Sequence, residues 1–181
     1  NEYGAISLAQ IFHGGMRCPQ RLTGVQPVSA SINSTSDSDN GETRALEDSE
    51  IEELVEAFAT AAARCEKAGF DGVEIHGAHG YLVCQFLGTE TNRRDDRWGG
   101  SLENRARFLL QIIERIRQFT SDDFLLGVRI SPEYKNIGVE LEDSLDLVDM
   151  LADSAIDFLH ISCWDCFIPP THHDDSRMVT E

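Results

Sequence analysis

Positive charge is scarce in this chain of 181 residues. It has 15 Lys and Arg against 32 Asp and Glu, which gives a formal net charge of −17. A surface this negative repels phosphate backbones and anionic lipid headgroups. The charge balance therefore argues against nucleic-acid binding and against a role at a membrane surface, and its simplest effect is to keep the protein in solution.

Long apolar runs are missing too. No stretch approaches the roughly 20 apolar residues that a membrane-spanning helix needs. No basic segment followed by an apolar one opens the chain. The first residue is Asn1 rather than methionine, and residues 169–181 form a mostly polar stretch without a closing element. We therefore expect both ends to be cut from a longer chain.

Cysteine gives no sign of a disulfide framework. The five cysteines are an odd number in a chain that is not small, which fits a reducing compartment, so we expect a cytoplasmic protein. Cys163 and Cys166 have the CxxC spacing of redox pairs and zinc knuckles, but no second pair accompanies them. We therefore expect no metal site and no redox disulfide.

What the chain does contain is an alternation of apolar runs and amphipathic segments. Hydrophobic residues make up 41% of it, which predicts a globular fold. The periodicity predicts strands at 5–12, 71–76, 124–130 and 156–162, and helices at 49–69, 101–119 and 141–153. The first strand, mostly apolar, is expected to be buried on both faces.

Two local signals refine these elements. Ser49 is the predicted N-cap of the first helix, and Glu52 completes a capping box three residues later. Residues 16–48 carry few regular signals and are rich in Ser, Thr, Asp and Asn, which predicts a long surface loop after the first strand. A loop of this length is usually functional or mobile.

The order of the elements predicts an α/β fold with parallel strands joined by right-handed crossovers. Doubly wound sheets and TIM barrels both show this order. No GxGxxG or Walker-type loop follows any strand, and polar residues follow the carboxyl ends of three strands, where a TIM barrel keeps its active site. Because a complete barrel needs about 250 residues, we expect these four strands to form half of one.

Three residues at the end of the second predicted strand have side chains that can donate a hydrogen bond or a proton. His76 and His79 are three residues apart, and Tyr81 follows two residues later. Two imidazoles could ligate a metal, but no evident motif places a third ligand. Alternatively, two imidazole N–H groups could polarise one substrate oxygen while a phenol protonates the adjacent carbon. The second arrangement predicts addition of hydride and a proton across an activated double bond.

Two polar residues lie inside apolar strands. Arg129 needs an anion or an acceptor, since burying an unpaired cation is costly. Glu74, which shares strand parity with His76, is its expected structural partner. The amide of Gln10 offers both a donor and an acceptor, so it could read the edge of a planar heterocycle. Each residue alone could be a satisfied structural group, and their common place at strand ends favours function.

Four segments of the chain resemble the Old Yellow Enzyme family of FMN-dependent oxidoreductases. They are Gln10–Gly15, Gly-Phe-Asp-Gly-Val-Glu-Ile-His-Gly-Ala-His-Gly-Tyr at 69–81 with its extension to Arg105, Gly127–Pro132, and His160–Ser162. The resemblance implies a TIM barrel with FMN across its mouth. Residues 1–181 would be a partial FMN-binding barrel, covering roughly strands 3 to 6. Residues 92–105 are expected to shape a loop and cap the next helix.

The resemblance also implies a role for each candidate residue. Gln10 would hydrogen-bond the pyrimidine edge of the flavin, and Arg129 would sit beside the flavin N1 and C2 carbonyl. His76 and His79 would hold the carbonyl oxygen of an enone-type substrate, and Tyr81 would donate the proton. The implied reductant is NADH or NADPH, whose hydride reaches the β-carbon of the α,β-unsaturated carbonyl through the flavin.

The chain departs from the family pattern at three places. It has Gly88-Thr89 where Ser-Pro is usual, Trp98 where tyrosine is usual, and Met16 where an arginine is often found, with Arg17 next. Two alternatives remain for the function. One is the dienoyl-CoA reductase-like branch, whose iron–sulfur cysteines would lie beyond residue 181. The other is a non-catalytic half barrel. A homo-oligomer is compatible with either.

Overall fold

The computed structural model describes residues 3–163, 165, 167 and 169. Its elements, in chain order, are β1 (Leu8–Ile11), η1 (Gly15–Arg17), α1 (Gln20–Thr23), β2 (Val28–Ser29), β3 (Arg44–Ala45), α2 (Asp48–Lys67), β4 (Gly72–Gly77), α3 (Leu82–Leu87), α4 (Leu102–Phe119), β5 (Leu125–Ile130), η2 (Lys135–Ile137), α5 (Leu141–Ala152) and β6 (Phe158–Ile161). None of the helices in these residues is long and apolar enough to cross a membrane.

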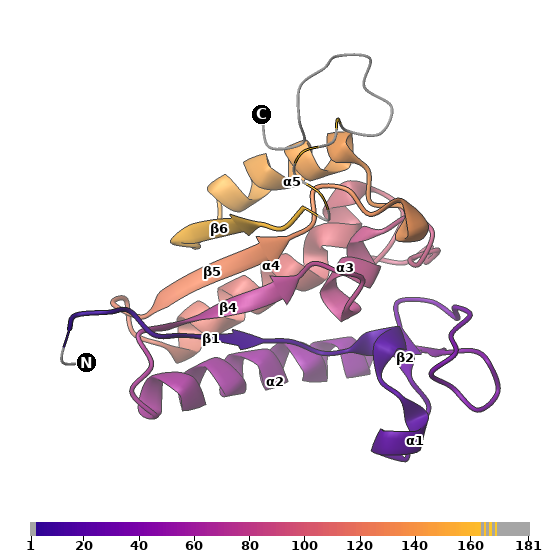
Figure 1. Cartoon of the computed structure of the whole chain (residues 1–181), viewed down its shortest axis with the longest axis horizontal. Coiled ribbons are helices and arrows are strands. Elements are labelled where there is room, and N and C mark those ends of the chain that lie inside the picture. Colours follow the sequence, from indigo (N-terminus) through magenta and orange to yellow (C-terminus); the bar gives the residue numbers. More distant parts are fainter. Residues whose placement is uncertain (1–2, 164, 166, 168, 170–181) are drawn as a thin grey trace.

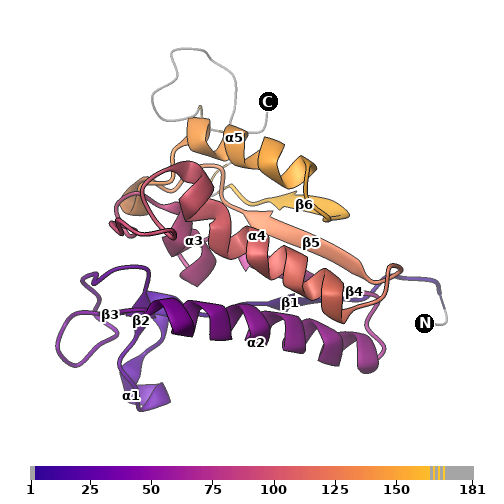
Figure 2. The ribbon, with the colours of Figure 1, turned by 180° about the vertical axis from the view of Figure 1, so that it is seen from behind.

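Four of the strands form one parallel sheet in the order β1-β4-β5-β6 (Figure 1). Seen from behind, α2 and α4 cover one face of this sheet and α5 lies along β6 (Figure 2). All four predicted strands and all three predicted long helices are present, with ends shifted by a few residues. The sheet has the parallel strands and one-sided helices of half an α/β barrel.

Successive side chains along each strand point to opposite faces of the sheet. Val73, Ile75, Leu126 and Val128 are fully buried in the core that the sheet shares with α2 and α4. Their neighbours in sequence face the other side, because side chains alternate along a strand. The register places these in two adjacent rows across the sheet: Gln10, Glu74, Gly127 and Phe158, and then His76, Arg129 and His160.

The first strand is less buried than predicted. In β1, Leu8 is 40% exposed and Gln10 is also exposed. The prediction of a strand buried on both faces was wrong because β1 is an edge strand. Its Leu8 and Gln10 project from the face that the helices do not cover.

The cap of α2 also differs from the prediction. Glu47, not Ser49, is the N-cap, and the capping box pairs it with Glu50 rather than using Glu52. The backbone N–H of Glu47 donates to Glu50 Oε2 at 2.8 Å. Arg44 fixes the same carboxylate through two hydrogen bonds of 2.6 and 2.8 Å. The Glu50 side chain is therefore held in place to close the box two residues earlier than predicted.

Residues 16–48 are more ordered than the predicted surface loop. They contain most of η1, all of α1 and the parallel pair β2–β3. Ala30 is fully buried, and the buried Asn33 donates from Nδ2 to the carbonyl oxygen of Thr91 at 2.9 Å. These contacts attach the segment to the loop that follows α3.

The loop from Asn92 to Ser101 is held by its own polar side chains. Asn92 Nδ2 donates to the carbonyl oxygens of Phe86 and Trp98 at 2.7 and 2.8 Å. Ser101 caps α4 by accepting from the backbone N–H of Asn104. The prediction that this segment shapes a loop and caps the next helix is confirmed.

Candidate active site

Three predicted site residues lie together where β4 ends. The ring centroids of His76 and His79 are 5.1 Å apart, with the rings almost perpendicular. Tyr81 is the N-cap of α3, and its ring centroid lies 4.9 Å from that of His76. The short connection from β4 into α3 therefore brings two imidazoles and one phenol into direct contact.

The backbone of His79 is held in an uncommon conformation. Its φ of 58° is the only positive φ of a non-glycine residue in the described part of the chain. Such values are rare for residues that carry a Cβ. The backbone N–H of His79 donates to Ser131 Oγ at 3.1 Å, and Arg17 Nη1 donates to its carbonyl oxygen at 2.7 Å. Strain of this kind is typical of functional sites.

Both imidazoles of the pair are neutral at pH 7. Burial, with smaller contributions from the neighbouring His79 and Arg129, lowers the pKa of His76 to about 4. Burial also lowers the pKa of His79, with Arg129 and Arg17 adding to the effect. A neutral imidazole donates one hydrogen bond and accepts one. The pair therefore offers N–H donors rather than positive charge.

Arg129 does not pair with Glu74, contrary to the prediction from strand parity. Glu74 accepts a hydrogen bond from Gln10 Nε2 and one from His160 Nδ1, the latter at 2.9 Å. Arg129 Nη2 donates to Ser162 Oγ at 2.9 Å instead. The register explains this, because Arg129 lies opposite His76, one row beyond Glu74.

Two buried nitrogen atoms in this site have no hydrogen-bond partner within the described residues. They are Nδ1 of His76 and Nε of Arg129. An unsatisfied buried donor costs about 1–3 kcal/mol, so native proteins rarely keep one without a reason. A ligand rich in oxygen and nitrogen acceptors would satisfy them. The exposed amide of Gln10, one row away on the same face, adds a group that can pair with a heterocycle edge. These residues fit a flavin.

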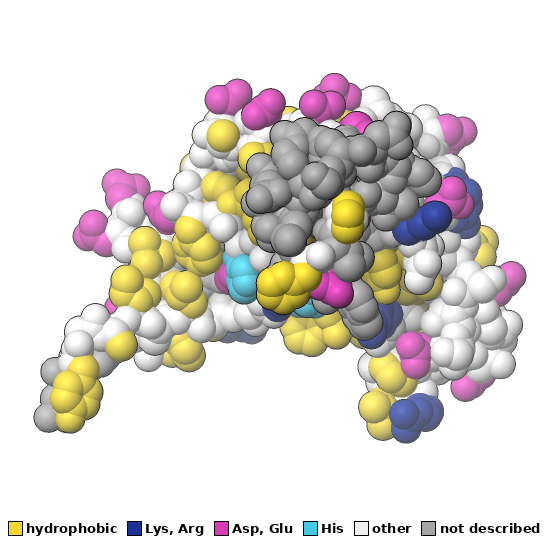
Figure 3. Space-filling view, turned by 45° about the horizontal axis from the view of Figure 1, so that its top comes forward, with side chains coloured by type: hydrophobic (Ala, Val, Ile, Leu, Met, Phe, Trp, Pro, Cys, Tyr) yellow, Lys and Arg dark blue, Asp and Glu magenta, His cyan; other side chains and the backbone are white. Residues whose placement is uncertain are grey.

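The structure adds residues that the sequence did not single out. The ring centroid of Phe12 lies 5.2 Å from that of Tyr81, and the Arg17 guanidinium carbon lies 4.9 Å from the Tyr81 centroid. Ser162 Oγ lies 2.7 Å from His79 Nε2. All three follow the carboxyl end of a strand, which is the signal that identified His76 and His79. In the space-filling view, histidine and hydrophobic side chains lie together at the surface (Figure 3).

No group of three or more His, Cys, Asp or Glu in the described residues could hold a metal ion. Among the residues that the structure describes, the pair His76 and His79 therefore has no third ligand of this kind. Of the CxxC pair, Cys163 is partly buried. Cys166 lies outside the described residues.

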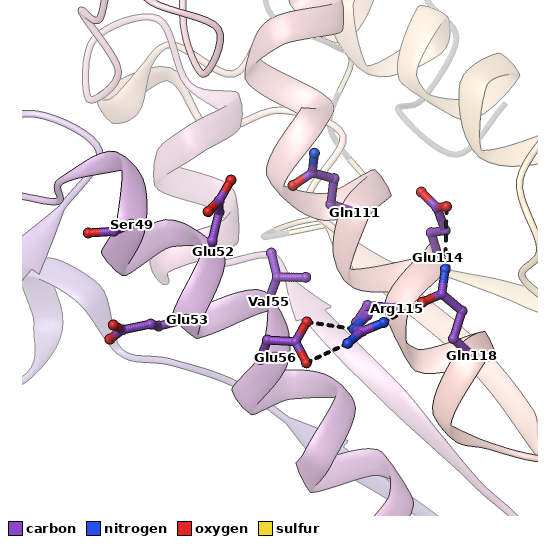
Figure 4. A pocket seen from close by; sticks show the side chains of 9 residues that line it. All are labelled: Ser49, Glu52, Glu53, Val55, Glu56, Gln111, Glu114, Arg115 and Gln118. Carbon is purple, nitrogen blue, oxygen red and sulfur yellow. Dashed lines mark hydrogen bonds and ion pairs between the residues drawn. The ribbon is translucent and has the colours of Figure 1, made fainter.

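A separate groove of about 690 Å³ lies on the other side of the sheet, between α2 and α4. Its lining is mostly acidic and amide side chains (Figure 4). Arg115 in this groove is bound to Glu56 through contacts of 2.6 and 3.0 Å. The groove contains none of the predicted site residues.

The parallel half barrel and the arrangement of the candidate site fit a barrel-type flavin-dependent oxidoreductase, and comparisons with known proteins show the same family. Residues 1–181 match the model of the NADH:flavin oxidoreductase / NADH oxidase family. The chain belongs to this family. This confirms the predicted class of enzyme, with FMN as its cofactor and NADH or NADPH as its reductant at the level of the family.

Individual relatives support the same assignment. The chain is 44% identical over 169 residues to the "Probable NADH-dependent flavin oxidoreductase YqiG" of Bacillus subtilis, covering 90% of this chain and 45% of the relative. The old yellow enzyme homologue from Zymomonas mobilis superposes with a TM-score of 0.79 at 34% identity, covering 90% of this chain and 49% of that one. The predicted TIM-barrel fold is confirmed, and the chain spans about half the length of these relatives.

Proposed function

We propose that this chain is part of an NAD(P)H-dependent flavin oxidoreductase that reduces a carbon–carbon double bond conjugated to a carbonyl group. The observation that carries the proposal is that the neutral imidazole of His76 contacts both the imidazole of His79 and the phenol of Tyr81, at centroid distances of 5.1 and 4.9 Å. Such a group can hold an oxygen and deliver a proton to a nearby carbon.

When bound, FMN would supply the hydride, which it takes from NADH or NADPH and passes to the substrate. Gln10 and Arg129 would hold its pyrimidine portion. Gln10 commits its amide nitrogen to Glu74, so its carbonyl oxygen remains as an acceptor for a ring N–H. Arg129 brings a positive charge and the unpaired Nε, both of which suit an electron-rich ring edge.

His76 and His79 would bind the carbonyl oxygen of the substrate. A neutral imidazole suits this role because its N–H stabilises the negative charge that develops on the oxygen. His76 is 5% exposed, and electrostatic interactions are stronger where water is excluded. Tyr81 would then give its hydroxyl proton to the carbon next to the carbonyl group.

Flavin titration followed by turnover tests the proposal. FMN is added to the apoprotein, both as the 181-residue chain and as the whole protein that contains it, and binding is followed by quenching of flavin fluorescence. NAD(P)H oxidation is then measured with and without cyclohexenone. We expect enone-dependent oxidation by the whole protein. A whole protein that binds FMN and oxidises NAD(P)H without reducing any enone would refute the proposed substrate class. FMN binding and cyclohexenone reduction by the 181-residue chain itself would exclude the non-catalytic half barrel.

A second candidate is the branch of the family that adds an iron–sulfur cluster. Its support is that 2-naphthoyl-CoA reductase superposes with a TM-score of 0.82 at 33% identity, while this chain covers only 27% of that protein, which leaves room for a further domain. The cluster cysteines would lie beyond residue 181. Iron and acid-labile sulfide content of the whole protein distinguishes the two branches.

A further inference from the structure

One hydroxyl group connects the two halves of the candidate site. Ser162 Oγ lies 2.9 Å from Arg129 Nη2 and 2.7 Å from His79 Nε2. Ser162 follows β6 directly, and its backbone N–H donates to the carbonyl oxygen of Ile130 at 2.9 Å. The hydroxyl is therefore held from the backbone between the arginine on the proposed flavin side and the histidine on the proposed substrate side.

The donors available fix the direction of the hydrogen bond with Arg129, and they leave the hydroxyl hydrogen of Ser162 for the bond with His79. A guanidinium group only donates, so Ser162 Oγ must be the acceptor toward Arg129. The hydroxyl keeps one hydrogen of its own. Accepting from a cation polarises the hydroxyl and makes it a better donor, because hydrogen bonds in a chain reinforce one another. The neighbouring nitrogen, Nε2 of His79, is the acceptor within reach.

A neutral imidazole has one nitrogen with a hydrogen and one without. Burial and the nearby cations lower the pKa of His79, which keeps its ring neutral. If Nε2 accepts from Ser162, the ring hydrogen must be on Nδ1. The tautomer of an imidazole is commonly set in this way, by the hydrogen bond that its other nitrogen makes.

We propose that Ser162 is a positioning residue that fixes His79 in its Nδ1–H tautomer and links it to Arg129. Its consequence for binding rests on the proposed function: His79 would hold the substrate oxygen through Nδ1–H rather than through Nε2–H. Because Ser162 contacts both residues, a change in the hydrogen bonding of Arg129 would alter the hydrogen bond from Ser162 to His79 in the substrate site.

Nitrogen-15 NMR tests the tautomer directly, without turnover. The imidazole nitrogens of the whole protein, with FMN bound, are correlated with the ring carbon-bound hydrogens at pH 7. A ring nitrogen with a hydrogen and one without differ strongly in chemical shift. We expect His79 to carry its hydrogen on Nδ1. A wild-type protein with the hydrogen on Nε2 would overturn the proposal, whatever its activity.

Three variants separate positioning from general structural damage. Ser162→Ala should move His79 toward the Nε2–H tautomer, while Ser162→Thr, which keeps the hydroxyl, should restore the wild-type spectrum. Ser131→Ala is the matched control, because Ser131 Oγ contacts the backbone N–H of His79. It should leave the ring tautomer unchanged. A Ser162→Ala spectrum identical to that of the wild type would also overturn the proposal.

Ligand affinity supplies a second measurement. Binding of p-hydroxybenzaldehyde to the oxidised holoprotein is followed through its charge-transfer absorption with the flavin. Ser162→Ala should weaken binding by about 2- to 12-fold, the effect of one lost hydrogen bond, and Ser162→Thr should stay within about 2-fold. Unchanged affinity in Ser162→Ala would contradict the link. A wild-type protein with the expected tautomer but no enone turnover would refute the proposed function and leave the assignment of Ser162 intact.

Discussion

The two sides of the sheet differ in what surrounds their buried nitrogen atoms. In the groove between α2 and α4, Nε of Arg115 is buried and makes no hydrogen bond within the described residues, but it lies 2.6 Å from a carboxylate oxygen of Glu56. Arg115 also donates from Nη2 to Glu56 at 3.0 Å and from Nη1 to Gln118 at 2.6 Å (Figure 4). On the other side, Nδ1 of His76 and Nε of Arg129 are buried and have no partner within the described residues. Paired surface charges contribute only about 0–1 kcal/mol to stability. Unsatisfied buried donors cost stability, so they indicate where a ligand belongs.

The largest effect is expected at Tyr81. Tyr81→Phe should slow enone reduction by about 10²- to 10⁴-fold, which is the usual contribution of a general acid. Reduction of the flavin by NAD(P)H needs no proton from this residue and should stay near the wild-type rate. Stopped-flow absorbance of the whole protein measures the two half-reactions separately. Equal losses in both would remove Tyr81 from the role of proton donor.

A large effect is also expected at the imidazole pair. His76→Ala combined with His79→Ala should abolish the charge-transfer complex with phenols. Enone reduction should fall at least 10²- to 10³-fold, as when a single oxyanion donor is removed. Circular dichroism shows whether the variant is folded. Phenol affinity equal to that of the wild type would exclude the pair as the oxygen-binding site.

A moderate effect is expected in the pH dependence of stability. The pKa of His76 is about 4 in the folded protein, because burial disfavours the charged ring, against an ordinary 6.5. Between these two pH values the unfolded chain binds more protons than the folded protein does. The stability contributed by neutral His76 is therefore lost as pH falls from about 6.5 toward 4. Urea unfolding at pH 7 and pH 5 should show a smaller loss in His76→Asn than in the wild type. An equal or larger loss in the variant would contradict this.

The smallest effect is expected in the groove. Arg115→Gln should change the free energy of unfolding by no more than about 1 kcal/mol, because the pair with Glu56 is exposed to solvent. Both half-reactions should keep wild-type rates. Thermal unfolding and stopped-flow absorbance of the same preparation measure this. A large loss of activity would show that the groove acts on the site through the sheet.

The sequence predicts the parts of the site that are close together along the chain. His76, His79 and Tyr81 lie within six residues, so one strand end is enough to bring them together. The partner of Arg129 was predicted wrongly, because strand parity defines the face of a sheet but not the row across it. Ser162 is 83 residues from His79, and only the registers of β4 with β5 and of β5 with β6 bring them into contact.

In the fold too, the sequence predicts features that are local along the chain and not those that depend on distant contacts. The long amphipathic helices and apolar strands were predicted because their periodicity is local. The cap of α2 depends on Arg44, which holds the Glu50 carboxylate, and β2–β3 pairs two-residue strands that are too short to have a pattern. The burial of β1 depends on its place at the edge of the sheet. These features arise from tertiary contacts that no short window of sequence contains.

The positive φ of His79 constrains which residues this position can accept during evolution. Asparagine tolerates the left-handed region better than most other residues that carry a Cβ, and its side-chain amide also has an N–H donor. An exchange of imidazole for amide would therefore need little change in the backbone between β4 and α3. Related proteins could alter how they hold a substrate oxygen here by a single substitution, while the loop keeps its shape.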